Sequence, residues 1–85
     1  MAKVVRLTLA KAIAKANLRR AEQGQKPWTM NSLAVQAGVA ATTITRLARD
    51  AADPKAASAL SLELASKLVT LLDCGIEDVL EVTEP

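Results

Sequence analysis

The sequence predicts a small, mainly helical domain, and three observations support this prediction. The chain has 85 residues, and single domains have between about 50 and 250, so we expect residues 1–85 to form one domain. It contains one Trp and neither Phe nor Tyr, so its core has to come from Leu, Ile, Val and Ala. Alanine is the best helix former, and leucine is close behind. A core this small is marginal, and many such domains gain stability by pairing with a second copy.

The two ends of the chain are richer in β-branched residues than its middle. Residues 4–9 and residues 79–83 both have the composition of a short strand. A strand on its own leaves its backbone N–H and C=O groups unpaired, so we expect these two to pair as a short antiparallel ribbon. The alternative is that both ends fray.

The first helix is predicted over residues 9–22, and Gly24 ends it. Its predicted buried face consists of Leu9, Ala10, Ile13, Ala14 and Ala21. Basic side chains recur every four residues on another side, at Lys11, Lys15 and Arg19. A row of this kind is usually the solvated side of a helix, and contact with a polyanion is the alternative.

Residues 30–49 are predicted to form two short helices joined by a tight turn. The buried face of the first helix consists of Leu33, Ala34 and Ala37, and Gly38 can take the left-handed conformation that ends a helix. Val39 is expected to fill the corner, and the second helix then buries Ile44, Leu47 and Ala48. Its other side carries the polar and basic side chains that a helix needs in a DNA groove, namely Thr42, Thr45, Arg46 and Arg49.

Capping and packing signals lie before this pair of helices. Thr29 is placed to cap the first of them, and Trp28 is placed to pack on Leu33 as a hydrophobic staple.

Residues 50–60, after the pair, form a linker that Pro54 keeps from being helical. The next helix starts after its cap, Ser61, with an inward stripe of Leu62, Ala65, Leu68, Val69 and Leu72. Two further leucines, Leu64 and Leu71, widen that stripe and are expected either beneath the ribbon or at a dimer contact. Gly75 then turns the chain after this helix, and residues 76–80 are expected to form a single helical turn.

Several classes of function are disfavoured by composition. One cysteine, Cys74, and no histidine provide neither a disulfide nor a set of zinc ligands. The sequence has no paired-carboxylate, Ser-His or Cys-His set and no phosphate-binding glycine loop, so we expect no enzyme activity, no cofactor and no metal. It has no apolar run long enough for a signal peptide or a membrane span, so we expect a cytoplasmic protein without a membrane partner.

The charge is unevenly distributed along the chain. Residues 1–49 hold nine basic side chains against one acidic side chain, whereas residues 50–85 hold two against eight. The two segments therefore carry net charges of +8 and −6. Because the basic segment contains the predicted pair of helices, this asymmetry favours a polyanion as the partner.

The spacing of residues 30–49 resembles the helix-turn-helix of the Cro and phage-repressor family, also called the xenobiotic-response-element family. The resemblance is carried by a small residue at Ala34, Gly38 four positions later, Val39, and apolar anchors at Ile44 and Leu47. It extends over about residues 9–80 and implies a compact five-helix lambda-repressor-like domain. It also implies a sequence-specific regulator of transcription, a repressor in particular, that binds double-stranded DNA as a homodimer. The family usually has a Ser or Thr cap where this chain has Ala40, and often a Gln where it has Met30.

The expected DNA contacts fall into two groups. The helix predicted over residues 41–49 would lie in the major groove, with base edges contacted by Ala41, Thr42, Thr45 and Arg46. Arg46 can donate two hydrogen bonds to guanine, and Thr42 offers a hydroxyl and a methyl group. Phosphates would be contacted by Thr29, Met30, Asn31, Thr43 and Arg49, the first three of them at a helix N-terminus.

An alternative function is a helical protein-interaction module, similar to an antitoxin, whose main partner is another protein. The two functions are compatible, because small regulators often have both.

Overall fold

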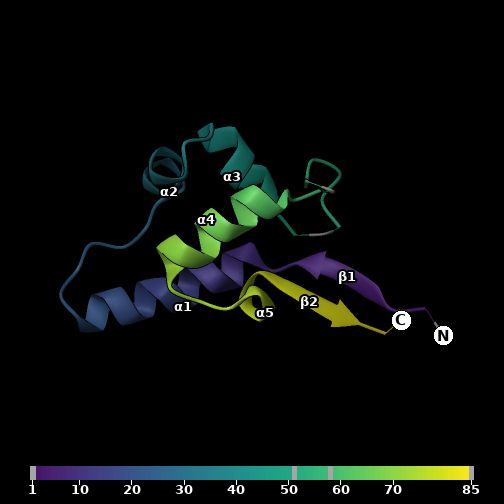
Figure 1. The fold of residues 1–85 in the computed structure, drawn as a ribbon, viewed down its shortest axis with the longest axis horizontal. Coiled ribbons are helices and arrows are strands. Elements are labelled where there is room, and N and C mark those ends of the chain that lie inside the picture. The colour runs from purple at the N-terminus through teal and green to yellow at the C-terminus, as the bar shows by residue number, and fades with distance from the viewer. Residues whose placement is uncertain (1, 51, 58, 85) are drawn as a thin grey trace.

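The computed structural model describes residues 2–50, 52–57 and 59–84. Within these residues it contains five helices and one two-stranded antiparallel sheet (Figure 1). The elements in order are β1 (Val4–Leu7), α1 (Leu9–Glu22), α2 (Met30–Ala37), α3 (Ala41–Leu47), α4 (Leu62–Leu72), α5 (Ile76–Val79) and β2 (Leu80–Thr83). The prediction of a compact, mainly helical fold with a terminal ribbon is confirmed. No helix among the described residues is long and apolar enough to cross a membrane.

The ribbon joins the first and last described segments of the chain. Its register pairs Val4 with Thr83, Val5 with Val82, Arg6 with Glu81 and Leu7 with Leu80. Thr8 extends this connection, because its N–H donates to the Val79 carbonyl at 2.7 Å and its hydroxyl donates to the Asp78 carbonyl at 2.9 Å. In Figure 1, α1 and the ribbon lie end to end along the longest dimension of the molecule, which is 45 Å. The ribbon therefore projects from the helical body.

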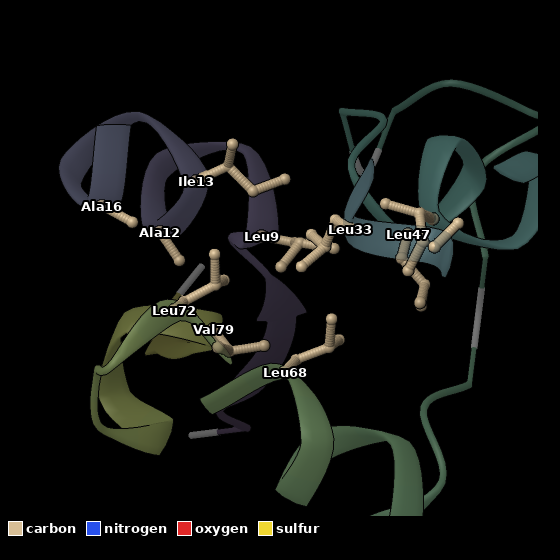
Figure 2. Close-up of a cluster of buried hydrophobic side chains, with 11 residues drawn as sticks. Leu9, Ala12, Ile13, Ala16, Leu33, Leu47, Leu68, Leu72 and Val79 are labelled. Atoms are coloured by element: carbon tan, nitrogen blue, oxygen red, sulfur yellow. The ribbon is translucent and has the colours of Figure 1, made fainter. Parts of the chain in front are cut away.

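The core lies where α1, α4 and α5 meet the pair formed by α2 and α3. Its largest fully buried side chains are Leu9, Leu33, Ile44, Leu68, Leu72 and Val79. Figure 2 shows Leu72 and Val79 on the side of α1, and Leu9 between that group and Leu33 of α2. The core consists of Leu, Ile, Val and Ala, as the scarcity of aromatic residues predicts. Val39, Leu64 and Leu71 are half-buried against it.

The predicted buried face of α1 was wrong in part. Leu9 and Ile13 are buried, but Ala10, Ala14 and Ala21 are exposed, and the other buried residues are Ala12 and Ala16. The buried positions follow Leu9 at offsets of three, four and seven, which is the stripe that one face of a helix presents. Alanine has too little apolar area to determine which way a helix faces.

One predicted buried position of α4 was also wrong. Leu62 is 86% exposed, whereas Ala65, Leu68 and Leu72 are buried as predicted. Leu62 is the first residue of α4, directly after its cap Ser61, whose hydroxyl accepts a hydrogen bond from the Leu64 N–H at 3.1 Å. The side chain of Leu62 therefore faces solvent, and the buried residues of α4 begin about one turn later, at Ala65.

Three helices end at a residue in the left-handed conformation. Gly24 ends α1 with φ +70°, Gly38 ends α2 with φ +73°, and Asp73 ends α4 with φ +50°. After each, an N–H donates to the carbonyl five residues earlier, at 2.8 Å (Gln25 to Arg20), 3.0 Å (Val39 to Ala34) and 3.0 Å (Cys74 to Val69). This is the Schellman motif. We predicted that Gly75 would turn the chain after α4. Gly75 instead has φ −90° and caps α5, and Asp73 takes the left-handed position.

Two members of the basic row on α1, Lys15 and Arg19, bind within the molecule. Arg19 donates to the Leu72 and Asp73 carbonyls at 2.6 and 3.1 Å, at the C-terminal end of α4, where the helix dipole favours a cation. Lys15 forms an ion pair of 2.8 Å with Asp78. This pair and the N–H of Gly75 hold the pKa of Asp78 below its ordinary value. Lys15 and Arg19 therefore brace α1 against α4 and α5.

Substituting Gly38 tests the turn between α2 and α3. Nothing lies within 4 Å of the place where a Cβ would sit, so the cost of a side chain comes from the backbone conformation alone. We expect Gly38→Val to lower the free energy of unfolding by at least about 1–2 kcal/mol, because β-branched residues resist φ values near +73°. Gly38→Asn is the control, since asparagine tolerates this conformation. Equal denaturation midpoints for the valine variant and the wild type would contradict this account of the turn.

Candidate nucleic-acid interface

The start of α2 is fixed by local contacts that the sequence predicts. Thr29 and Ser32 form a capping box, in which the Thr29 Oγ1 accepts from the Ser32 N–H at 3.0 Å and the Ser32 Oγ accepts from the Thr29 N–H at 2.9 Å. Trp28 packs against the core, as expected for a staple. The side chain of Asn17 on α1 binds both backbone groups of Trp28. Its Oδ1 accepts from the Trp28 N–H at 2.6 Å, and its Nδ2 donates to the Trp28 carbonyl at 3.0 Å.

The turn at Gly38 then sets the direction of α3. Ile44 is 0% exposed and Leu47 is 3% exposed, so these two side chains anchor the helix in the core. Ala40, at the N-cap, makes no side-chain capping hydrogen bond. A helix of seven residues without a cap is not stable alone, so packing holds α3 in place.

The opposite side of α3 faces a groove, whose second wall is the segment after the helix. The groove has a volume of about 440 Å³ and is lined by Thr42, Thr45, Arg46, Arg49, Pro54 and Lys55. Thr42 and Arg46 are exposed, and Thr45 and Arg49 are half-buried. The four polar or basic residues that we predicted on one side of the second helix are therefore together.

Arg46 is supported at one nitrogen. Its Nε donates to the Lys55 carbonyl at 3.3 Å, and its side chain borders the groove. This contact orients the guanidinium through Nε, and the two terminal amino groups are the pair that donates to a planar acceptor such as guanine.

Two of the other predicted base contacts, Thr45 and Ala41, are less accessible than Thr42. Thr45 donates its hydroxyl to the Ala41 carbonyl at 3.0 Å, so the proton of this hydroxyl is engaged by the helix itself. Ala41 is half-buried and packs against the core. Thr43, predicted to contact phosphate, lines a different groove, beside Leu60, Ser61 and Leu64 at the start of α4.

The predicted helix over residues 41–49 is shorter in the structure. α3 ends at Leu47, so Arg49 lies beyond the helix, where its Nη1 pairs with Asp53 Oδ2 at 3.1 Å. The predicted linker, residues 50–60, contains no helix or strand among its described residues. It is nevertheless held against α3, because the Ala57 N–H donates to the Arg46 carbonyl at 3.0 Å.

The remaining predicted phosphate contacts lie at the N-terminus of α2. Thr29, Met30 and Asn31 are all exposed. The first backbone hydrogen bond of α2 runs from the Leu33 N–H to the Thr29 carbonyl at 3.0 Å, so the amides of Met30 and Asn31 precede it. Such amides, with the positive end of the helix dipole behind them, suit an anion.

Sequence reasoning missed that two basic residues lie near Arg49. Arg6 on β1 and Lys11 on α1 line a second groove of about 440 Å³ together with Arg49, and the acidic side chains in its lining are Asp50 and Glu81. Nothing in their spacing along the chain indicates this grouping, because it depends on where the ribbon meets the end of α3. Only the excess of positive charge in residues 1–49 pointed toward it.

No protein-family model, curated protein or solved structure matches this chain.

Two substitutions on α3 test the division between its anchored and free sides. We expect Ile44→Ala to lower the free energy of unfolding by about 2–5 kcal/mol, because it removes fully buried methyl groups and leaves a cavity. Thr42→Ala is expected to change it by no more than about 0.5 kcal/mol, because Thr42 is exposed. Chemical denaturation measures both. A large loss for Thr42→Ala would show that this side of the helix is packed.

Proposed function

We propose that the chain is a sequence-specific regulator of transcription, a repressor in particular, that binds double-stranded DNA with α3 in the major groove. We propose with it a lambda-repressor-like arrangement of the helices and membership of the Cro and phage-repressor family. One observation carries the proposal. Ile44 and Leu47 seal one side of α3 in the core, while Thr42 and Arg46 extend from the other side into an open groove.

The dimensions of α3 suit a major groove. An α-helix with its side chains is ~10–12 Å across, and the major groove of B-DNA is ~12 Å wide, so α3 can lie within it. In this arrangement Arg46 donates to guanine with its two terminal amino groups, and Thr42 contacts a neighbouring base through its hydroxyl or its methyl group. Ala41 and Thr45 lie at the same interface, with smaller contributions because both are half-buried.

Contacts with the DNA backbone would surround these contacts with bases. Met30 and Asn31 offer amides at the start of α2 beside the exposed Thr29, Thr43 lies on α3, and Arg49 follows that helix. Lys55, which shares the groove of Arg46, and Arg6 and Lys11, which share a groove with Arg49, would extend these contacts. Contacts of this kind position a protein on the duplex and supply salt-dependent affinity.

A homodimer would place two copies of α3 in successive major grooves, with half-sites ~34–36 Å apart. The ribbon is the favoured contact between copies. Val5 and Val82 are directly paired across it, and each is 62% exposed. Leu64, the other contact considered from the sequence, is half-buried against the core of its own chain.

The second candidate function, a module that binds another protein, is favoured by a different observation. Val35 on α2 and Leu62 on α4 are 75% and 86% exposed, so both apolar side chains are available to a protein partner. The two functions differ in their dependence on salt, because only phosphate contacts release counterions.

A salt titration with labelled duplexes tests the proposed function. The purified chain is titrated with a pool of random-sequence duplexes, and retained duplexes are sequenced after repeated selection. We expect affinity to fall linearly with salt on logarithmic axes, by about 0.9 in slope for each phosphate contacted, and the selected site to have twofold symmetry. Binding that does not change with salt, or no retained duplex, would overturn the proposal.

Replacing Arg46 tests base readout. We expect Arg46→Ala to remove ~1–3 kcal/mol of discrimination at one base position, because the two-pronged contact with guanine is lost. Arg46→Lys is the control for charge, because it retains the positive charge but not the planar pair of donors. Both variants should therefore lose the preference at that position, while Arg46→Lys retains the salt slope. Unchanged preference in both variants would exclude Arg46 from readout.

A further inference from the structure

Arg49 lies where α3, the following loop and the ribbon meet. It borders the groove beside Thr42 and Arg46, and it also borders two grooves next to β1. Its side chain is only 36% exposed. Its Nε is buried and has no hydrogen-bond partner among the residues that the structure describes. A guanidinium that is partly removed from water in this way needs an anion close by.

Asp53 is that anion, and the loop holds it in position. Its Oδ2 accepts from Arg49 Nη1 at 3.1 Å, and its Oδ1 accepts from the Lys55 N–H at 2.8 Å. The Lys55 N–H and Arg49 keep the pKa of Asp53 below its ordinary value, so this carboxylate is ionised at neutral pH. Backbone hydrogen bonds from Asp53 to Asp50 at 2.9 Å and from Ala57 to Arg46 at 3.0 Å fix the loop around it.

We propose that Asp53 competes with DNA phosphate for Arg49 and thereby sets the DNA affinity of the chain below what its basic surface would give. This inference rests on the proposed function. A carboxylate and a phosphate present similar pairs of oxygens to a guanidinium, so one guanidinium cannot be bound fully by both. With Asp53 in place, Arg49 contributes little to binding, and with Asp53 neutralised it becomes a full phosphate contact.

The test is a double-mutant cycle read with a labelled duplex of random sequence, because phosphates are the same in every duplex. Asp53→Asn removes the charge and keeps an oxygen that can accept from the Lys55 N–H. We expect it to tighten duplex binding by roughly three- to tenfold and to steepen the salt slope by about 0.9. Arg49→Gln should weaken binding little in the wild type, and should remove the whole gain in the Asp53→Asn background.

Asp50→Asn is the matched control. Asp50 carries the same charge in the same loop, and its Oδ1 accepts from the Ala52 N–H at 2.8 Å and not from Arg49. We expect a smaller gain in affinity for this variant, and a gain that Arg49→Gln does not remove. Circular dichroism of each variant reports whether it is folded.

The possible results separate the two proposals. Equal gains for Asp50→Asn and Asp53→Asn would reduce the role of Asp53 to general repulsion and overturn this inference alone. The same holds if Arg49→Gln weakens wild-type binding as much as Arg46→Gln does, a comparison that does not require the Asp53 variant to fold. If neither the wild type nor Asp53→Asn retains any duplex, the inference and the proposed function both fail.

Discussion

The left-handed turn at Gly38 is the constraint on which the candidate interface depends. It lets the Val39 N–H return to the Ala34 carbonyl, which ends α2 and sends α3 off at an angle. Only with this angle do Ile44 and Leu47 reach the core that contains Leu33. α3 has no side-chain cap and is too short to be stable alone. The packing of its buried side therefore determines the direction in which its exposed side faces. A change in the turn would therefore alter the direction of every side chain that faces the groove.

Several side chains of the basic half of the sequence hold groups of the acidic half. Arg19 binds the end of α4, Lys15 pairs with Asp78, and Arg49 pairs with Asp53. Arg20 stacks over the Trp28 ring at 4.5 Å and donates to the Lys26 carbonyl, so it too acts inside the fold. The net charge of a segment thus overstates the field that it offers to a partner. The charges that the proposed DNA partner would meet are those around the end of α3, where Arg6, Lys11, Arg46 and Lys55 lie beside the grooves.

Features with a local physical cause could be predicted from the sequence, and features that depend on distant contacts could not. Gly24 and Gly38 end helices because glycine alone adopts the left-handed conformation freely, and Thr29 and Ser61 cap helices through neighbouring amides. The terminal ribbon followed from the need of each strand for a partner. In contrast, the choice between Ala10 and Ala12 as the buried alanine depends on where α4 and α5 pack. The folding of the loop onto Arg49 likewise depends on where Asp53 and the Arg46 carbonyl lie in space, which the composition of the sequence does not indicate. The left-handed Asp73 was missed because Gly75, two positions later, is the better residue for that conformation.

The ribbon also has a consequence for the order in which the molecule assembles. Thr8 and Asp78, which meet at its base, are 70 positions apart, so joining them closes a loop that contains nearly all of the described chain. Closing such a loop costs less entropy once the helices between have already drawn its ends together. The two strands should accordingly form late and open first, so the amides of β1 and β2 would exchange with solvent through fluctuations that leave the helices intact.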